Sequence, residues 1–451
     1  MMKHEMNQSP NMGIQQTSPT PQVAEAAQLT ATEAAASIAR KKLSASDLAE
    51  ACIARTLLRD EEVRAWTVFY PPMVREQAAA RDAEPVRGVL HGVPVGIKDI
   101  LFTEDLPTTY NSVHFASHYP KMDAAVVSLL RAAGAVIFGK NDTVEFAVNG
   151  RRARTRNPHD LARTPGGSSS GSAAAVADFQ VPVSIGTQTG GSVIRPASYC
   201  GVYAMKPTWN VVSTEGMKAC APSIDTLGWY GRSAADISLL CDVFAIPGDE
   251  REPLQAFDGA RIAICHSPVW DQAQTETRNA ISRCMELLKT AGVEVDILQL
   301  PEIFDGITGA HKVVMQSEMR STFLPQFLDL GEALYPELVA TLRNASGYTS
   351  ADLRQAYDLA AECRARFDVL AAPYDAVITP STTGEAPFGP DNTGAATFNR
   401  IWTLLHTPCV NVPGFNGPNG MPVGLTVTGP RFTDRRVVAA AALLGELIAA
   451  S

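Results

Sequence analysis

Two consecutive stretches, G-G-S-S-S-G-S-A-A-A-V-A from Gly166 to Ala177 and V-S-I-G-T-Q-T-G-G-S-V-I-R-P-A from Val183 to Ala197, each place a serine in a glycine-rich turn. The two serines are Ser168 and Ser192. Glycine adopts backbone conformations closed to other residues and lets a ligand approach the main chain, so serines set between glycines are available for chemistry. The pattern indicates a serine nucleophile site built from two turns.

A lysine upstream supplies a third element. In G-V-P-V-G-I-K-D, from Gly92 to Asp99, Lys98 ends an apolar run. Taken alone, such a lysine usually extends its amine to the surface. If it is buried instead, desolvation favours its neutral form, and a neutral amine accepts a proton from a serine hydroxyl directly or through a second hydroxyl. The three elements together indicate serine catalysis with a lysine base.

Composition narrows the class of protein. The chain has 451 residues, 45% of them hydrophobic, which is enough for a large core, and a net charge of −9. Its one short basic run contains Arg151, Arg152, Arg154 and Arg156 and is interpreted as a solvated or ion-paired loop. A nucleic-acid partner is therefore not expected.

The N-terminal residues have no apolar segment of the kind a secretory signal needs, and no later apolar stretch approaches ~20 residues. We expect a disordered tail over residues 1–24, no membrane partner and a cytoplasmic location. The eight scattered cysteines lack any C-x-x-C pair and are interpreted as reduced core residues.

Helical and strand-like patterns alternate along the chain. Residues 24–80 are predicted helical, with Ser44 or Ser46 as an N-cap. Later patterns predict strands at 93–97, 135–138, 176–185, 202–205, 261–265 and 293–298, with helices at 124–133 and 274–291. This alternation predicts an α/β protein with a sheet covered by helices. No linker follows the tail, so residues 25–451 are expected to form one domain, with a variable substrate-pocket region at about 250–400.

Three competing motifs are weaker. The G-x-S-x-G pattern centred on Ser169 matches a nucleophile elbow, but a polar, proline-interrupted loop precedes it where an elbow needs a strand. Gly134–Asn141 resembles a phosphate-binding loop, yet its apolar interior predicts a strand. His114 and His118 have helical metal-ligand spacing without a third ligand.

The stretches 92–99, 166–177 and 186–197 together resemble the amidase signature family, and the spacing between Ser168 and Ser192 also fits that family. Weaker agreement extends through residues 206–208, 223–228, 374–380 and 420–429. The resemblance implies a single large mixed β-sheet covered on both faces by helices, an α/β/α sandwich.

The resemblance also implies a role for each site residue. Ser192 would be the nucleophile, Ser168 the bridging serine and Lys98 the base that takes the proton through Ser168. Gly167 would precede Ser168 by a cis peptide, and Ser169 would support the turn. Backbone N–H groups of the oxyanion turn would stabilise the tetrahedral intermediate; this turn consists of Thr189, Gly190, Gly191 and Ser192. No metal or organic cofactor is implied.

Two positions depart from the family pattern. Gln188 stands where the family often has aspartate, and Arg195 lies three residues after Ser192 where the family commonly has arginine at the second. These departures argue against the inference that this chain binds a substrate carboxylate as members of the family do.

The expected activity is hydrolysis of small neutral aryl or alkyl amides, or of carbamates (urethanes), through a serine acyl-enzyme. The partner would be a small-molecule substrate, and the chain a monomer or homodimer. An apolar pocket is expected around Phe146 and Ala147, with Tyr110 and Trp402. Two alternatives stay open: the glutamine-hydrolysing subunit of a tRNA-dependent amidotransferase, and a catalytically inactive binding protein on the same fold.

Overall fold

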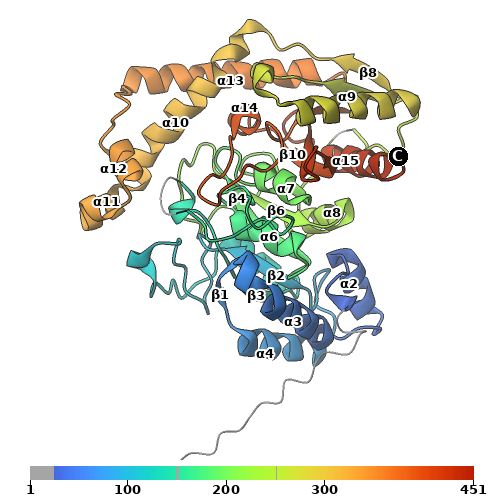
Figure 1. The fold of residues 1–451 in the computed structure, drawn as a ribbon, viewed down its shortest axis with the longest axis vertical. Coiled ribbons are helices and arrows are strands. Elements are labelled where there is room, and N and C mark those ends of the chain that lie inside the picture. The colour runs from blue at the N-terminus through green and yellow to red at the C-terminus, as the bar shows by residue number, and fades with distance from the viewer. Residues whose placement is uncertain (1–24, 149–151, 250) are drawn as a thin grey trace, which may run out of the picture.

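The centre of the molecule is one mixed sheet of eleven strands (Figure 1), seen in a computed structural model that describes residues 25–148, 152–249 and 251–451. The predicted tail, 1–24, lies outside the described residues. The strands are β1 (Trp66–Phe69), β2 (Pro94–Lys98), β3 (Val136–Asn141), β4 (Val183–Gln188), β5 (Tyr203–Lys206), β6 (Thr226–Gly231), β7 (Arg261–Ile264), β8 (Glu294–Ile297), β9 (Ala376–Pro380), β10 (Cys409–Asn416) and β11 (Pro422–Thr428). Their order across the sheet is β1-β3-β2-β4-β6-β5-β10-β11-β9-β7-β8.

The sheet contains two groups of parallel strands, and antiparallel strands lie between these groups. β2 lies between β3 and β4 and is parallel to both, and β7 is parallel to its neighbours β8 and β9. The strands between these blocks pair antiparallel. All five residues of β2 are buried, as expected of a strand covered on both faces, and this explains the apolar run that ends at Lys98.

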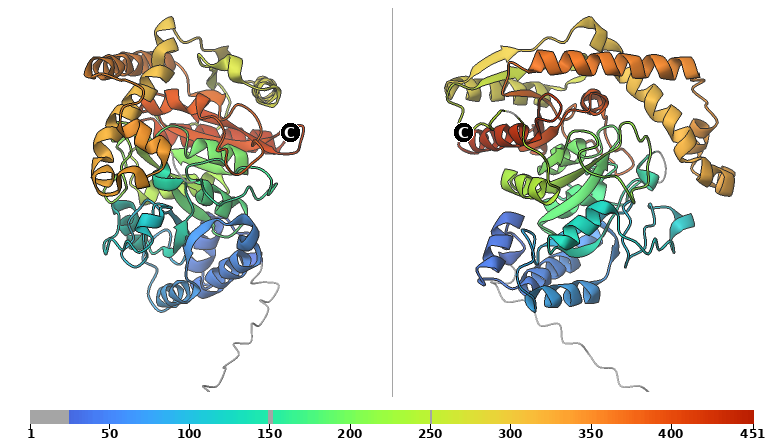
Figure 2. Two further views of the ribbon diagram at one scale, coloured as in Figure 1. Left: turned by 60° about the vertical axis from the view of Figure 1, so that its left-hand side comes forward. Right: turned by 180° about the vertical axis from the view of Figure 1, so that it is seen from behind.

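Helices cover both faces of the sheet, with further helices at one end (Figure 2). The helices are α2 (Ala31–Ala39), α3 (Ala45–Val63), α4 (Pro71–Asp82), α5 (Ala125–Ala132), α6 (Ser170–Ala177), α7 (Ile194–Cys200), α8 (Ala234–Val243), α9 (Thr275–Thr290), α10 (Ile307–Thr322), α11 (Leu324–Leu330), α12 (Pro336–Leu342), α13 (Ser350–Ala371), α14 (Thr397–Leu404) and α15 (Asp434–Ala449). α6 packs against α7 and the sheet, and α8 packs against α15 and the sheet. α10 and α13 pack together at the end opposite α3 and α4.

The predicted α/β class and the mixed, helix-covered sheet are confirmed, and Ser44 is the N-cap of α3. Two local predictions are wrong. The helical pattern over 24–80 is interrupted by β1, whose Trp66 packs its ring against Phe138 of β3. Val176 belongs to α6 and not to a strand, because this alanine-rich helix is buried at every residue but its last and therefore shows no amphipathic period.

The competing motifs have structural explanations. Residues 136–141 of the loop-like glycine pattern form β3, as expected. His114 and His118 each contact a backbone carbonyl oxygen, of Ala333 and Thr108 respectively, which gives both imidazoles a structural role.

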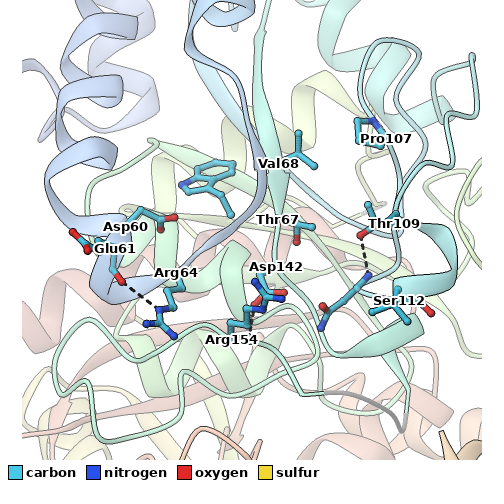
Figure 3. A pocket seen from close by; sticks show the side chains of 14 residues that line it. Asp60, Glu61, Arg64, Thr67, Val68, Pro107, Thr109, Ser112, Asp142 and Arg154 are labelled. Atoms are coloured by element: carbon cyan, nitrogen blue, oxygen red, sulfur yellow. Dashed lines mark hydrogen bonds between the residues drawn. The ribbon is translucent and has the colours of Figure 1, made fainter.

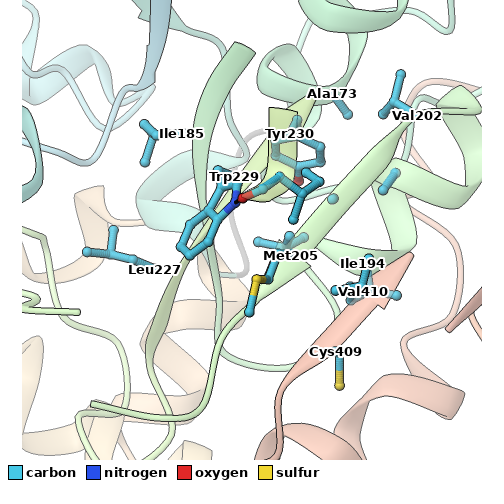
Figure 4. Close-up of a cluster of buried hydrophobic side chains, with 14 of the residues drawn as sticks. Ala173, Ile185, Ile194, Val202, Met205, Leu227, Trp229, Tyr230, Cys409 and Val410 are labelled. Atoms are coloured by element: carbon cyan, nitrogen blue, oxygen red, sulfur yellow. Dashed lines mark hydrogen bonds between the residues drawn. The ribbon is translucent and has the colours of Figure 1, made fainter. Parts of the chain in front are cut away.

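The core beneath the site is built around Trp229 on β6 (Figure 4). Its neighbour Tyr230 is fully buried, and the phenol donates a hydrogen bond to the Ser192 carbonyl oxygen at 3.2 Å. The core thus contacts the serine turn directly. The eight cysteines are buried and unpaired, as predicted. Among the described helices, none is both long and apolar enough to cross a membrane.

Candidate active site

Lys98 and Ser168 are in direct contact. The Lys98 Nζ lies 2.8 Å from Ser168 Oγ, 2.8 Å from Thr187 Oγ1 and 3.4 Å from the Thr187 carbonyl oxygen. Lys98 ends β2, and Thr187 lies near the end of the neighbouring strand β4. Because parallel strands end at the same edge of a sheet, the fold brings this amine and the Thr187 hydroxyl together, and the turn before α6 adds the Ser168 hydroxyl.

The amine of Lys98 is held in a site that favours its neutral form. The side chain is fully buried and has no carboxylate within ion-pair distance in the described part of the chain. Burial lowers the pKa of Lys98 well below its ordinary value, and the more distant Asp225 carboxylate opposes this only in part. A neutral amine at this position has a lone pair that accepts a proton.

Ser192 lies in the turn between β4 and α7 and is more exposed than the serines near it. Its side chain lines a cavity of about 280 Å³, and Ser168 lies on the same wall. Ser168 is 5% exposed and Ser169 is fully buried. Of these three hydroxyls, Ser192 is therefore the one most open to a substrate.

The Gly167–Ser168 peptide bond is cis, as the resemblance implies. The carbonyl oxygens on both sides are held by side chains. Thr143 donates to the Ser168 carbonyl at 2.8 Å, and Arg195 donates to the Gly167 carbonyl and, at 2.5 Å, to the Gly394 carbonyl. Arg195, shifted by one position from the family pattern, therefore anchors the Ser168 turn.

The oxyanion turn exposes its N–H groups. The Thr189 carbonyl accepts a hydrogen bond from His311 Nε2 at 2.8 Å, and the Gly190 carbonyl accepts one from Thr403 Oγ1 at 2.7 Å. Because N–H and C=O point in opposite directions across a trans peptide, these contacts turn the next N–H groups the other way. Within the described residues, the N–H groups of Gly190, Gly191 and Ser192 have no protein acceptor.

The Gln188 side chain holds the backbone that follows Ser192 by hydrogen bonds. Its Oε1 accepts hydrogen bonds from the N–H groups of Val193 and Ile194, at 2.8 and 3.1 Å, and its Nε2 donates to Thr403 Oγ1 at 3.0 Å. A carboxylate could accept the first two bonds but could not donate the third. This explains how glutamine replaces aspartate here while the backbone around Ser192 stays held.

Ser169 is a supporting residue and has no access to the cavity. Its hydroxyl donates to the Thr187 carbonyl at 3.1 Å and accepts from the Thr187 N–H at 3.2 Å. A serine engaged on both sides and fully buried cannot attack a substrate, so the structure does not support a nucleophile elbow.

The expected pocket residues divide into two groups. Ala147 lines the cavity, whereas Phe146, Tyr110 and Trp402 are not on its described wall. Phe146 stacks on Tyr110 with ring centroids 5.6 Å apart, and Trp402 packs against Phe367. All three side chains are buried, and each ring packs against another aromatic ring. They therefore belong to the core and not to the wall of the cavity.

Several site residues have little signature in the sequence. Thr187 is a polar residue inside a buried strand, a pattern that could have drawn attention to it. His311 and Thr403 come from α10 and α14, in or near the region expected to vary, and only folding brings them to the turn.

A larger cavity of about 640 Å³ lies elsewhere and holds none of the predicted catalytic residues. It opens along the edge strand β1, beside Asp60, Arg64 and Asp142 (Figure 3). The Asp142 carboxylate accepts hydrogen bonds from the N–H groups of Arg154 and Thr155, which gives it a structural role there. The smaller cavity, which holds Ser192, is therefore the candidate active site.

The fold and the buried lysine–serine contact define an α/β protein of the amidase class. A family model described as Amidase matches residues 47–438, and the chain belongs to this family.

Among the relatives, a glutamyl-tRNA(Gln) amidotransferase subunit from Anaeromyxobacter sp. (strain K) is 31% identical over 91% of this chain and 94% of its own length. The native peptide amidase of Stenotrophomonas maltophilia is 26% identical, with a TM-score of 0.81 over 94% of this chain and 97% of its own. A structure described as "An unexpected vestigial protein complex reveals the evolutionary origins of an s-triazine catabolic enzyme" is 27% identical, with a TM-score of 0.84 over 93% of this chain and 98% of its own.

Proposed function

We propose that this protein hydrolyses the C–N bond of small amides through an acyl-enzyme formed on Ser192. The observation that carries the proposal is the contact between Lys98 Nζ and Ser168 Oγ in the wall of the cavity that holds Ser192. A buried amine without a carboxylate partner, hydrogen-bonded to a serine beside a more exposed serine, is an arrangement suited to activating a hydroxyl.

In this mechanism Ser192 Oγ attacks the amide carbonyl carbon. Its proton passes to Ser168, whose own proton moves to Lys98 Nζ. The N–H groups of Gly190, Gly191 and Ser192 are available to the oxyanion that forms, and one well-placed donor of this kind is worth about 3 kcal/mol in the transition state. The relay then returns the proton to the leaving nitrogen as the C–N bond breaks, and water hydrolyses the ester through the same groups.

The size of the cavity supports a small substrate. Its volume of about 280 Å³ lies just below the usual range of about 300–1,000 Å³ for ligand sites. One nucleophile and one oxyanion site serve amides and carbamates equally, so aryl carbamates belong to the same proposal.

A second candidate is the glutamine-hydrolysing subunit of a tRNA-dependent amidotransferase. It is favoured by the names of several relatives that are 30–31% identical over about nine tenths of the chain. The two candidates share their chemistry up to the acyl-enzyme and differ in what receives the ammonia. Hydrolysis of small amides by the purified chain alone would argue for the first candidate. Glutamine-dependent amide transfer that requires added partner subunits would argue for the second.

The proposal is tested by release assays on primary amides, anilides and aryl carbamates. Wild type is compared with Ser192→Ala, Ser168→Ala and Lys98→Ala, and Ser169→Ala serves as the neighbouring serine control. We expect a fluorophosphonate to label Ser192 in wild type. Full activity in Ser192→Ala, or a label on Ser169, would contradict the assignment.

A further inference from the structure

Asp225 is a buried carboxylate beside the candidate active site that the proposed mechanism does not use. It directly precedes β6, and the register between β4 and β6 pairs Gln188 with Thr226. Because these two strands are antiparallel, the residue after Gln188 and the residue before Thr226 lie opposite each other. They are Thr189, the first residue of the oxyanion turn, and Asp225. The sheet therefore places this carboxylate against the turn that contains Ser192.

Both oxygens of the Asp225 carboxylate accept hydrogen bonds. Oδ1 accepts one from the Thr189 hydroxyl at 2.6 Å, and Oδ2 accepts one each from the N–H groups of Cys220 and Ala221, at 2.7 and 3.0 Å. Burial raises the pKa of Asp225, and these three hydrogen bonds oppose that rise. Each oxygen is thus met by donors, as an ionised carboxylate requires.

The contact with Asp225 holds Thr189 at one of two points. Its hydroxyl donates to Asp225, and its carbonyl oxygen accepts a hydrogen bond from His311. The Thr189 carbonyl and the Gly190 N–H belong to the same planar peptide unit, so fixing Thr189 also fixes the direction of that N–H. Asp225 therefore contributes to the orientation of the first oxyanion donor.

Asp225 also acts on Lys98, from the other side of β4. Lys98 ends β2, Asp225 precedes β6, and β4 lies between these two strands. Burial lowers the pKa of Lys98, and the charge of Asp225 is the largest effect that opposes burial. The Cys220 thiol has a smaller effect and is uncharged near neutral pH, because burial raises its own pKa well above the ordinary value. Arg195 acts in the same direction as burial.

Three further titratable side chains lie around Asp225. Glu318 of α10 raises the pKa of Asp225 slightly, and Lys218 has a pKa that burial lowers to about 8. His311 is neutral near pH 7, because burial lowers its pKa to about 4. Since Lys218 titrates in the range where activity is expected to change, its contribution has to be measured separately.

We propose that Asp225 is a positioning residue of this active site, which holds the first residue of the oxyanion turn and stabilises the ammonium group that Lys98 becomes when it takes the proton. The inference rests on the proposed function, in which Lys98 is the base. A buried cation without a carboxylate in contact is costly. A negative charge across one strand reduces this cost without forming an ion pair that would keep the amine protonated.

The test follows the labelling of Ser192 by a small fluorophosphonate as a function of pH, a measurement that does not depend on the natural substrate. In wild type the labelling rate should rise to a plateau as Lys98 becomes neutral. Asp225→Asn removes the charge and keeps the contacts, because the amide oxygen accepts from the two N–H groups and the amide nitrogen donates to the Thr189 hydroxyl.

Two changes are expected in Asp225→Asn. The midpoint of the profile should move to lower pH by about one unit, because the ammonium form of Lys98 loses its stabilisation. The plateau should fall about tenfold, because a less basic amine is a poorer proton acceptor. A residue that supports only the fold would change the plateau without moving the midpoint.

Thr189→Val separates the two roles of Asp225. It removes the hydroxyl that contacts the carboxylate and leaves the charge in place. The plateau should therefore fall about tenfold, less than for the loss of an oxyanion donor, while the midpoint stays at the wild-type pH.

Asp434→Asn is the matched control. Asp434 is buried at the start of α15, accepts hydrogen bonds from the hydroxyl and the N–H of Thr208, and does not line the Ser192 cavity. Burial lowers the pKa of another lysine, Lys206, and Asp434 opposes this as Asp225 does for Lys98. Asp434→Asn should keep the wild-type profile. Lys218→Met should keep the wild-type midpoint, and urea unfolding shows which variants are folded.

An unchanged midpoint in Asp225→Asn, the same shift in Asp434→Asn, or loss of the titration in Lys218→Met would overturn this inference and leave the proposed function standing. If Asp225→Asn does not fold, Thr189→Val decides: a plateau equal to that of wild type would overturn the inference, and a reduced plateau with an unchanged midpoint would support it. A wild type that is not labelled at Ser192 would instead contradict the proposed function itself.

Discussion

Lys98 and Lys140 lie on the neighbouring strands β2 and β3, both fully buried, and only one of them has a carboxylate partner among the described residues. Lys140 Nζ is 3.2 Å from Asp99 Oδ1, whereas Lys98 Nζ contacts Ser168 and Thr187. Burial lowers the pKa of both amines, and the adjacent Asp99 counteracts this only for Lys140. The two strands thus hold one amine beside a carboxylate and the other beside two hydroxyls, the arrangement that the proposed function needs of Lys98.

The first prediction concerns the pH dependence of activity. Lys98 accepts a proton only when it is neutral, so kcat/KM should rise with pH through the lowered pKa of Lys98 and then level off. The measurement is a pH profile with a good substrate. A profile that stays flat from acid to alkaline conditions would exclude a lysine base.

The second prediction compares the stability of the two lysine variants. The folded-state pKa of Lys98 lies below its ordinary value of 10.5, so between these two values the unfolded chain binds more protons than the folded one. The free energy of unfolding of wild type therefore rises with pH in this window, by at most ~1.4 kcal/mol per pH unit from this group. Lys98→Met removes the pH dependence that this amine gives to the free energy of unfolding. The stability of the variant relative to that of wild type should therefore fall as the pH approaches 10.5.

Lys140→Met is the matched control. It leaves Asp99 buried without its cation and should destabilise the fold by about 3–5 kcal/mol at neutral pH. Urea unfolding at several pH values measures both variants. Equal pH dependence in Lys98→Met and wild type would show that Lys98 is charged in the folded protein.

The third prediction concerns His311 as a positioning residue. Its Nε2 must carry the proton to bond the Thr189 carbonyl, and with a pKa of about 4 the ring stays neutral above about pH 6. His311→Phe removes this bond and should lower kcat by about tenfold, less than the loss of a direct oxyanion donor, with little change in KM. His311→Gln retains an N–H donor and should recover part of the rate. If both variants are equally impaired, or if only KM changes, His311 has another role.

The sequence predicts which candidate catalytic residues lie together better than it predicts the residues that line the pocket. Lys98, Ser168 and Ser192 each lie in a short glycine-rich or strand-end motif, so local pattern alone draws attention to them. The pocket wall, in contrast, is assembled from α10, α14 and the turn after β3, and no periodicity shows which face of those elements meets Ser192. Phe146 shows why the pocket residues are hard to predict from the sequence. An aromatic ring close to a motif in the sequence packs into the core as readily as into a cavity, and the Phe146 ring stacks on Tyr110.

The last prediction uses two adjacent glycines of the oxyanion turn that differ in the space around them. A Cβ on Gly191 would lie too close to Asn399 Oδ1, at 2.4 Å, whereas a Cβ on Gly190 would have nothing closer than 3.6 Å, at His311. Asn399 cannot easily withdraw, because its Nδ2 donates to the Ser381 carbonyl at 3.0 Å. Gly191→Ala should therefore displace the turn and lower kcat by about 100-fold, the scale of a lost oxyanion donor, while Gly190→Ala should fold normally and lose much less. Gly191→Ala combined with Asn399→Ala removes the closest contact of the methyl group and leaves the Ala396 Cβ at 3.0 Å. The double variant should therefore recover part of the activity relative to Gly191→Ala, measured as kcat in the same amide assay. Activity of the double variant no higher than the product of the two single effects would show that Gly191 is required for a reason other than its contact with Asn399.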